Sequence, residues 1–123
     1  MTRNMKSHKD LTVWQKSFEL TKEVYFFTKK FPPAEIYGLT SQMRRSAVSI
    51  PSNIAEGYCR GSRKEYAQFV NIAFASGAEL ETQIMLAKEL KLADIRDFYK
   101  VELLLSEVMK MLNVLVRKLK NNS

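Results

Sequence analysis

The stretch from Phe98 to Leu119, FYKVELLLSEVMKMLNVLVRKL, decides the fold class of this chain. Apolar residues recur along it at alternating intervals of three and four: Phe98, Val101, Leu105, Val108, Leu112, Leu115 and Leu119. This spacing puts them on one side of an α-helix and is typical of a helix that packs against other helices. Asp94 precedes the stretch and is expected to cap it.

Three earlier segments have a similar periodicity. They are predicted to form helices from Val13 to Lys30, from Ala34 to about Tyr58, and from a capping box at Ser62 to about Ala87. Ile36 is expected to face inward near the start of the second helix. Pro51 lies within that helix, where proline removes a backbone donor, so we expect a kink there or two shorter helices.

Short connections between successive long helices favour antiparallel neighbours. The chain of 123 residues is therefore predicted to be all-α, an antiparallel up-down-up-down four-helix bundle in a single domain, 1–123. A domain of this size can bury a substantial core. We expect a flexible basic tail over residues 1–10 and a frayed end over residues 121–123.

The composition limits where the protein works. Cys59 is the single cysteine and cannot form an intramolecular disulfide, and no apolar stretch follows the N-terminus as an export signal would. Charged residues interrupt every apolar segment before it reaches the roughly 20 residues needed to span a bilayer. We therefore expect a cytoplasmic protein with no membrane partner.

The residue types that support catalysis are sparse. His8 is the single histidine, and the Glu-x-x-His pairs that hold metals in helix bundles are missing. Cys59 adjoins Arg60, but no histidine is expected beside it to act as a base. Nucleotide-binding glycine patterns and nucleophile elbows are also missing. The sequence therefore predicts no enzyme, no catalytic residue, no metal or cofactor, and no evident small-molecule substrate.

The net charge of +7 favours an acidic partner. An up-down bundle brings the N-terminal tail, the connection between the second and third helices, and the C-terminus to one end. We predict nucleic-acid binding there by Arg60, Arg63, Lys64, Arg117, Lys118 and Lys120, together with Arg3, Lys6 and Lys9. The alternative is that these charges only complement a helix dipole and maintain solubility. Tyr58 and Tyr66 flank the connection and would either stack on bases or pack internally.

A second group of residues is predicted to make contacts between helices or subunits. Trp14, Phe18 and Tyr25 form an additional apolar row beside the seam of the first helix. Antiparallel packing should also bring Arg44 and Arg45 to the level of Glu79 and Glu81, where we expect salt bridges. Arg44 would alternatively reach a neighbouring subunit.

Four motifs resemble the 23S rRNA-intervening-sequence family of bacterial four-helix-bundle proteins. They are DLTVWQK at 10–16, YGLTSQMRR at 37–45, SIPSNIAEG at 49–57 and ELETQ at 79–83. The resemblance covers about residues 10–92. The fourth helix agrees with the family in its apolar pattern more than in its amino-acid identities. It implies a homopentameric ring and no catalytic residues.

These observations support two functional hypotheses. The first is a non-enzymatic oligomeric adaptor whose basic end contacts RNA or DNA with little sequence preference. The second is a protein–protein interaction scaffold that makes no contact with nucleic acid.

Overall fold

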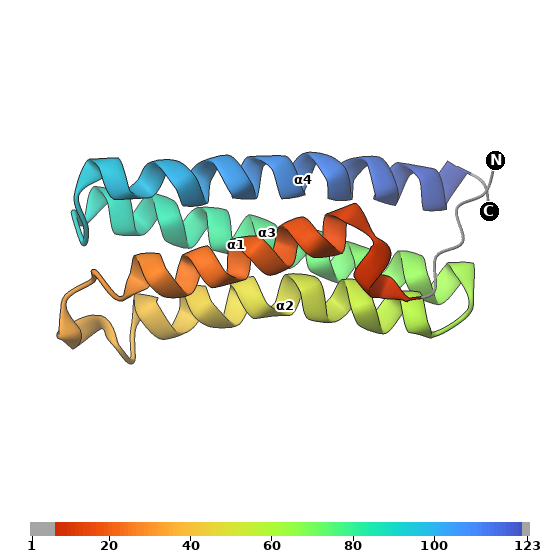
Figure 1. The fold of residues 1–123 in the computed structure, drawn as a ribbon, viewed down its shortest axis with the longest axis horizontal. Coiled ribbons are helices and arrows are strands. Elements are labelled where there is room, and N and C mark those ends of the chain that lie inside the picture. The colour runs from red at the N-terminus through yellow and green to blue at the C-terminus, as the bar shows by residue number, and fades with distance from the viewer. Residues whose placement is uncertain (1–6, 122–123) are drawn as a thin grey trace.

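The computed structural model describes residues 7–121, and these form four helices and no strands. The helices are α1 (Thr12–Thr28), α2 (Leu39–Cys59), α3 (Arg63–Glu89) and α4 (Phe98–Asn121), with short 3₁₀ turns η1 (His8–Asp10), η2 (Pro33–Glu35) and η3 (Ile95–Asp97). Figure 1 shows that successive helices run in opposite directions. The start of α1, the α2–α3 connection and the end of α4 lie at one end of the molecule. The predicted fold class is confirmed.

The core lies where the apolar seams of the four helices meet. Each helix packs against the next, and α4 closes the bundle against α1. Leu20, Ile50, Leu80 and Val108 are fully buried, one from each helix. At the far end of the bundle Phe27 packs edge-on against Phe98, with ring centroids 4.8 Å apart.

Pro51 lies inside α2 without dividing it, so the alternative of two shorter helices is wrong. Proline has no N–H to donate to the carbonyl of Ala47, four residues earlier. Thr21 on α1 supplies a donor, because its hydroxyl lies 3.0 Å from the Ala47 carbonyl oxygen. The break in the hydrogen bonding of α2 is therefore compensated by its neighbour.

The start of α2 differs from the prediction. The helix begins at Leu39 rather than Ala34, because residues 33–35 form the η2 turn. The Glu35 carboxylate accepts a hydrogen bond from the Leu39 N–H at 3.2 Å and so caps the first turn of α2. Ile36 precedes the helix and is 47% exposed, which contradicts its predicted place in the core.

Within the described residues, the N-terminal region contains a short turn, η1. Ser7 caps η1, and the Asp10 carboxylate accepts from the Ser7 N–H to complete a capping box. Residues 8–10 of the predicted flexible tail thus form a capped 3₁₀ turn. Residues 1–6, with Arg3 and Lys6, and 122–123 of the predicted frayed end lie outside the described residues, whereas Asn121 belongs to α4.

The predicted caps of α3 and α4 are present only in part. The Ser62 hydroxyl accepts from the Glu65 N–H at 3.0 Å, while the Glu65 carboxylate pairs with Arg60. Asp94 caps η3, the turn that leads directly into α4. Gly61 has a φ of 84°, a conformation that glycine adopts without strain, and it reverses the chain between α2 and α3.

Candidate nucleic-acid interface and neighbouring surfaces

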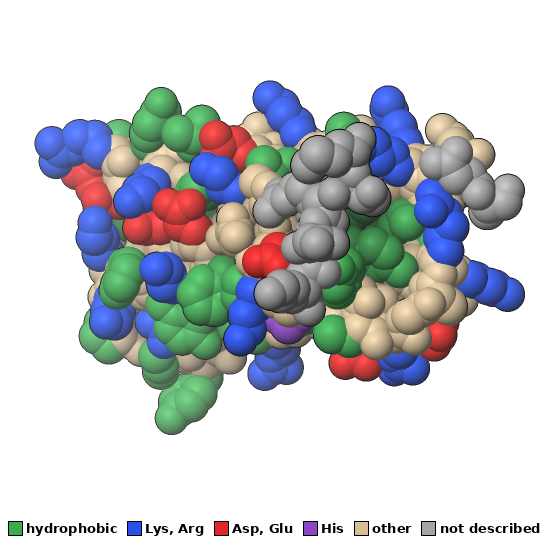
Figure 2. Space-filling view, turned by 45° about the vertical axis from the view of Figure 1, so that its right-hand side comes forward, with side chains coloured by type: hydrophobic (Ala, Val, Ile, Leu, Met, Phe, Trp, Pro, Cys, Tyr) green, Lys and Arg blue, Asp and Glu red, His purple; other side chains and the backbone are tan. Residues whose placement is uncertain are grey.

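The end of the bundle formed by the α2–α3 connection and the C-terminus of α4 is rich in basic residues. We call this the basic end, and its described members are Lys9, Arg60, Arg63, Lys64, Arg117, Lys118 and Lys120. The Arg63 guanidinium donates to the Lys118 carbonyl at 2.7 Å, which joins the first turn of α3 to the last turn of α4. Figure 2 shows Lys and Arg side chains around the right-hand side, where this end comes forward.

Arg60 lies between two carboxylates. Its guanidinium contacts the Glu56 carboxylate at 3.0 Å and the Glu65 carboxylate at 3.3 Å. It also lies over the Phe69 ring, 5.0 Å from the centroid. Arg60 therefore contributes little net positive charge at the surface, and Lys64 and Arg117, both exposed, are better placed to meet an anion.

Tyr58 and Tyr66 pack against each other edge-on at 5.8 Å, and both are half-buried. Burial, followed by the effect of Tyr58, raises the pKa of Tyr66 above its ordinary value. This geometry fits the packing interpretation rather than stacking on bases.

Among the described residues Arg44 forms no ion pair within 4.0 Å, so its predicted salt bridge with Glu79 or Glu81 is wrong. Its guanidinium donates to the Thr28 hydroxyl at 2.9 Å and lies 4.7 Å from the centre of the Tyr25 ring. A further contact of 3.5 Å reaches the Tyr25 carbonyl. Arg44 therefore holds the C-terminal turn of α1 and complements its dipole.

Arg45 does come to the level of Glu79, and both line a polar hollow between α2 and α3. However, among the described residues neither side chain forms an ion pair within 4.0 Å. Glu81 lies on another side of α3, so the predicted salt bridges of these residues are also wrong. The spacing in the sequence predicted how far along each helix these residues lie, but not toward which side of the helix their side chains point.

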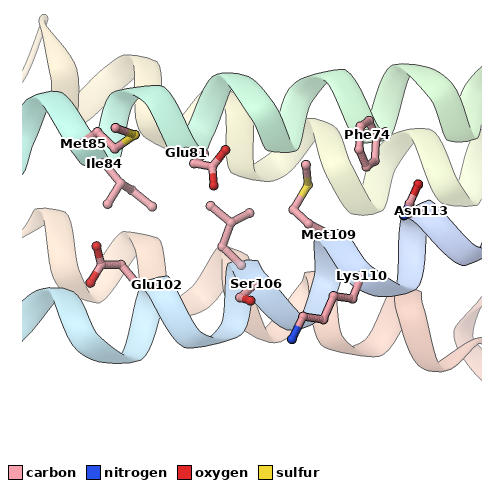
Figure 3. A pocket seen from close by; sticks show the side chains of 10 residues that line it. Phe74, Glu81, Ile84, Met85, Glu102, Ser106, Met109, Lys110 and Asn113 are labelled. Atoms are coloured by element: carbon pink, nitrogen blue, oxygen red, sulfur yellow. The ribbon is translucent and has the colours of Figure 1, made fainter.

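Glu81 lines a groove of about 460 Å³ between α3 and α4. In Figure 3 the Met109 side chain extends from α4 toward α3, and Glu81 faces the space between the two helices. The Glu102 carboxylate on α4 is engaged by Lys88 at 2.8 Å. Among residues 7–121, no three His, Cys, Asp or Glu side chains cluster as metal ligands would.

The predicted apolar row lies along a groove between α1 and α2. Trp14 stacks on Phe18 with centroids 5.0 Å apart, and Phe18 and Tyr25 are 47% and 39% exposed. The groove has a volume of about 620 Å³, and we call it the apolar groove; its lining includes Trp14, Phe18, Tyr25, Phe26, Val48, Pro51 and Ala55. Neither Phe26 nor the wall that α2 contributes was predicted as part of this row. Val48, Pro51 and Ala55 recur along one face of α2, and this spacing could have predicted that α2 forms the other side of the groove.

One expectation about Cys59 is wrong. The turn η1 brings the His8 Nδ1 atom to 3.8 Å from the Cys59 sulfur, although no histidine was expected nearby. The imidazole also packs edge-on against Trp14 at 5.2 Å. The contact attaches the N-terminal turn to the end of α2.

The fold and these surfaces define the chain as an antiparallel four-helix-bundle protein. No helix within residues 7–121 combines the length and the apolar character that crossing a membrane requires. The model of the 23S rRNA-intervening sequence protein family matches residues 9–114, so the chain belongs to that family.

A solved structure supports the fold independently. A protein of unknown function from the S23 ribosomal protein family of Bacteroides thetaiotaomicron superposes with a TM-score of 0.76 at 23% identity, covering 85% of this chain and 98% of that one. No curated protein matches. Neither the family nor this neighbour carries a known enzymatic activity.

Proposed function

We propose that this chain is a non-enzymatic, oligomeric adaptor whose basic end binds the phosphates of RNA or DNA. The supporting observation is the contact between Arg63 and the Lys118 carbonyl, which joins basic segments that are far apart in sequence. Seven Lys and Arg residues stand there against the three carboxylates of Asp10, Glu56 and Glu65. Two of those carboxylates are engaged by Arg60. Basic residues therefore outnumber carboxylates at this end, which leaves an excess of positive charge suited to a polyanion.

Phosphate contacts of this kind carry little sequence information. The tyrosines nearest this end, Tyr58 and Tyr66, pack on each other. We therefore infer broad recognition of nucleic acid, with affinity that falls steeply as salt concentration rises.

A charge-reversal pair tests this proposal. The double variant Lys64→Glu/Lys118→Glu should bind labelled RNA at least tenfold more weakly at low salt. Loss of two phosphate contacts should also reduce the slope of log K against log salt by roughly 1.4. The matched control Lys29→Glu/Lys91→Glu makes the same change in net charge at the opposite end. Equal weakening in both variants, or affinity indifferent to salt, would contradict the proposal.

We also infer self-association through the apolar groove, into a ring of the kind that family resemblance suggests. The groove holds large exposed aromatic side chains, Phe26 among them at 56% exposure. Contiguous apolar surface of this kind marks interaction sites. Light scattering on the purified protein should give a mass several times 14.3 kDa.

The apolar groove also supports the second candidate, a protein–protein scaffold whose basic end only maintains solubility. Affinity purification before and after nuclease treatment separates the two functions. A partner that survives both nuclease and high salt favours the scaffold. Loss of all bound material on nuclease treatment favours the adaptor.

A further inference from the structure

The outer face of α3 carries apolar side chains that remain exposed in the single chain. Ile72 and Leu86 lie two heptads apart on this face, and Leu90 follows just after the helix. The small residues Ala75 and Thr82, also exposed, fall between them on the same side. α3 therefore has a second apolar row besides the one that it buries in the core, and such a row is suited to packing on a further helix.

The charges beside this row are negative. Beyond the first turn of α3, its exposed charged side chains are all acidic: Glu79, Glu81 and Glu89. Glu79 lies in the row itself, midway between Ile72 and Leu86. Lys88, the one basic residue in this stretch, contacts the Glu102 carboxylate of α4 at 2.8 Å. The outer face of α3 is thus apolar and acidic.

The apolar groove between α1 and α2 has the opposite charge. A cation lies over each of its three exposed aromatic rings, with these distances to the ring centroids: Lys22 over Phe18 at 5.8 Å, Lys29 over Phe26 at 5.5 Å and Arg44 over Tyr25 at 4.7 Å. A partner that contacts these rings also approaches the three positive charges. The groove therefore favours an apolar surface that carries carboxylates.

The groove and the outer row of α3 are also similar in length. On α1 the groove extends from Trp14 to Phe26, about 18 Å at 1.5 Å per residue, and the row from Ile72 to Leu86 spans about 21 Å. Beyond α1 the apolar surface continues to Tyr37, which is 94% exposed. A helix of the size of α3 can therefore lie along this surface.

The outer face of α4 also exposes apolar side chains, namely Tyr99, Leu103 and Val114. Its exposed surface includes Lys110 and Arg117 as well. Placing these cations against those of the groove would bring like charges together, which is unfavourable. The charges therefore favour α3 over α4 as the surface that meets the groove.

We propose that the outer face of α3 in one copy of the chain packs into the apolar groove of the next copy, as a helix in a groove. This inference rests on the self-association proposed above and adds the surface that the groove meets. Because the two surfaces differ, the contact is heterologous, and each copy uses its groove for one neighbour and its α3 face for another. Repetition of such a contact builds a closed ring or a filament.

Mixing two interface variants tests the heterologous contact. Phe18→Asp disables the groove and Leu86→Asp disables the α3 face, so each variant alone should be monomeric by light scattering. Mixed in equal amounts at high concentration, the two should form a dimer and nothing larger. The Leu86→Asp copy still offers a groove, and the Phe18→Asp copy still offers an α3 face.

Two matched controls separate this face of α3 from its neighbour. Met85→Asp changes the residue beside Leu86, which is equally exposed but lines the groove between α3 and α4, and it should assemble as wild type does. Glu79→Lys should raise the dissociation constant of assembly by about tenfold or more, whereas Glu81→Lys, on the α3–α4 side, should not. All these variants should keep the helical circular dichroism of the wild-type protein.

The possible failures are distinguishable. A monomeric wild-type protein would overturn this inference together with the proposed self-association, and would leave the groove to a different protein. Assembly that is lost in Phe18→Asp but retained in Leu86→Asp would overturn the α3 contact alone. Two monomeric variants that do not associate with each other would also overturn it, because both surfaces would then belong to one symmetric interface.

Discussion

At the scale of single residues, the hydroxyl of Thr21 has an unusually well-defined role. It lies 2.8 Å from the Ser17 carbonyl of its own helix and 3.0 Å from the Ala47 carbonyl that Pro51 leaves without a donor. A buried carbonyl without a partner costs about 1–3 kcal/mol. Thr21 therefore makes the proline acceptable inside a packed helix.

Replacing Thr21 by valine should lower the free energy of unfolding by about 1–2 kcal/mol, because the Ala47 carbonyl loses its donor. In a Pro51→Ala background the restored N–H should bond that carbonyl, so the same replacement should cost much less. Urea unfolding of the four members of this cycle measures the coupling. Thr82→Val is the control, since Thr82 bonds a carbonyl of its own exposed helix face, and it should change stability by less than about 0.5 kcal/mol. If Thr21→Val lowers the free energy of unfolding equally in the wild-type and Pro51→Ala backgrounds, Thr21 does not act by compensating for Pro51.

Asp94 should titrate at an unusually low pH. The hydrogen bonds from Arg96, first from its side chain and then from its backbone, lower the pKa of Asp94 from 3.8 to about 2. Because the folded-state pKa is depressed, the stability contribution is present above pH 3.8 and is lost as pH falls through about 2. Carboxyl chemical shifts measured against pH should show this, and Arg96→Leu should move the titration upward. A midpoint unchanged by that substitution would contradict the assignment.

At the scale of helices, Gly57 and Gly77 differ in what an added methyl group would contact. A Cβ at Gly57 would lie 2.7 Å from the Cβ of Phe69 and 3.3 Å from the Tyr66 carbonyl, both fixed to the α3 backbone. A Cβ at Gly77 would meet the sulfur of Met109, the end of a flexible side chain. The two close approaches look alike in sequence but differ in what can move.

Gly57→Ala should therefore lower the free energy of unfolding by about 1–3 kcal/mol, because α2 and α3 must separate. Gly77→Ala should be near neutral, since the roughly 1 kcal/mol gained in helix propensity offsets the movement of Met109. Chemical unfolding followed by circular dichroism measures both. Equal destabilisation would mean that Met109 cannot change its rotamer.

The sequence predicted the helices well and their boundaries less well. The heptad from Phe98 to Leu119 and the Ser62 cap are local signals, and the structure confirms both. The start of α2 depends on whether Glu35 folds back onto the Leu39 N–H, which no periodicity reports. Arg44 points toward α1 because of how α2 is rotated about its own axis within the bundle. The spacing of residues along α2 does not determine this rotation.

At the scale of the whole molecule, the surfaces fall into three separate places. The basic end, the apolar groove along α1 and α2, and the polar hollow between α2 and α3 have different lining chemistry. The polar hollow was not predicted from the sequence, because its lining depends on how α2 and α3 are rotated toward each other. The basic end was within reach, because antiparallel order alone brings its segments together.

The proposals for the groove and the basic end make a joint prediction. If the groove joins subunits, then assembly gathers several basic ends, and the affinity for a long RNA exceeds that of one subunit by avidity. Phe18→Asp places a charge in the groove, and Phe18 is not one of the residues assigned to nucleic acid. It should yield monomers by light scattering and should weaken binding to long RNA by at least tenfold, while a short RNA that spans a single basic end binds as before. Leu103→Asp is the control, because Leu103 on α4 is also 47% exposed but lies outside the groove. Monomers that bind long RNA as tightly as the wild-type protein would separate assembly from nucleic-acid binding and restrict recognition to a single subunit.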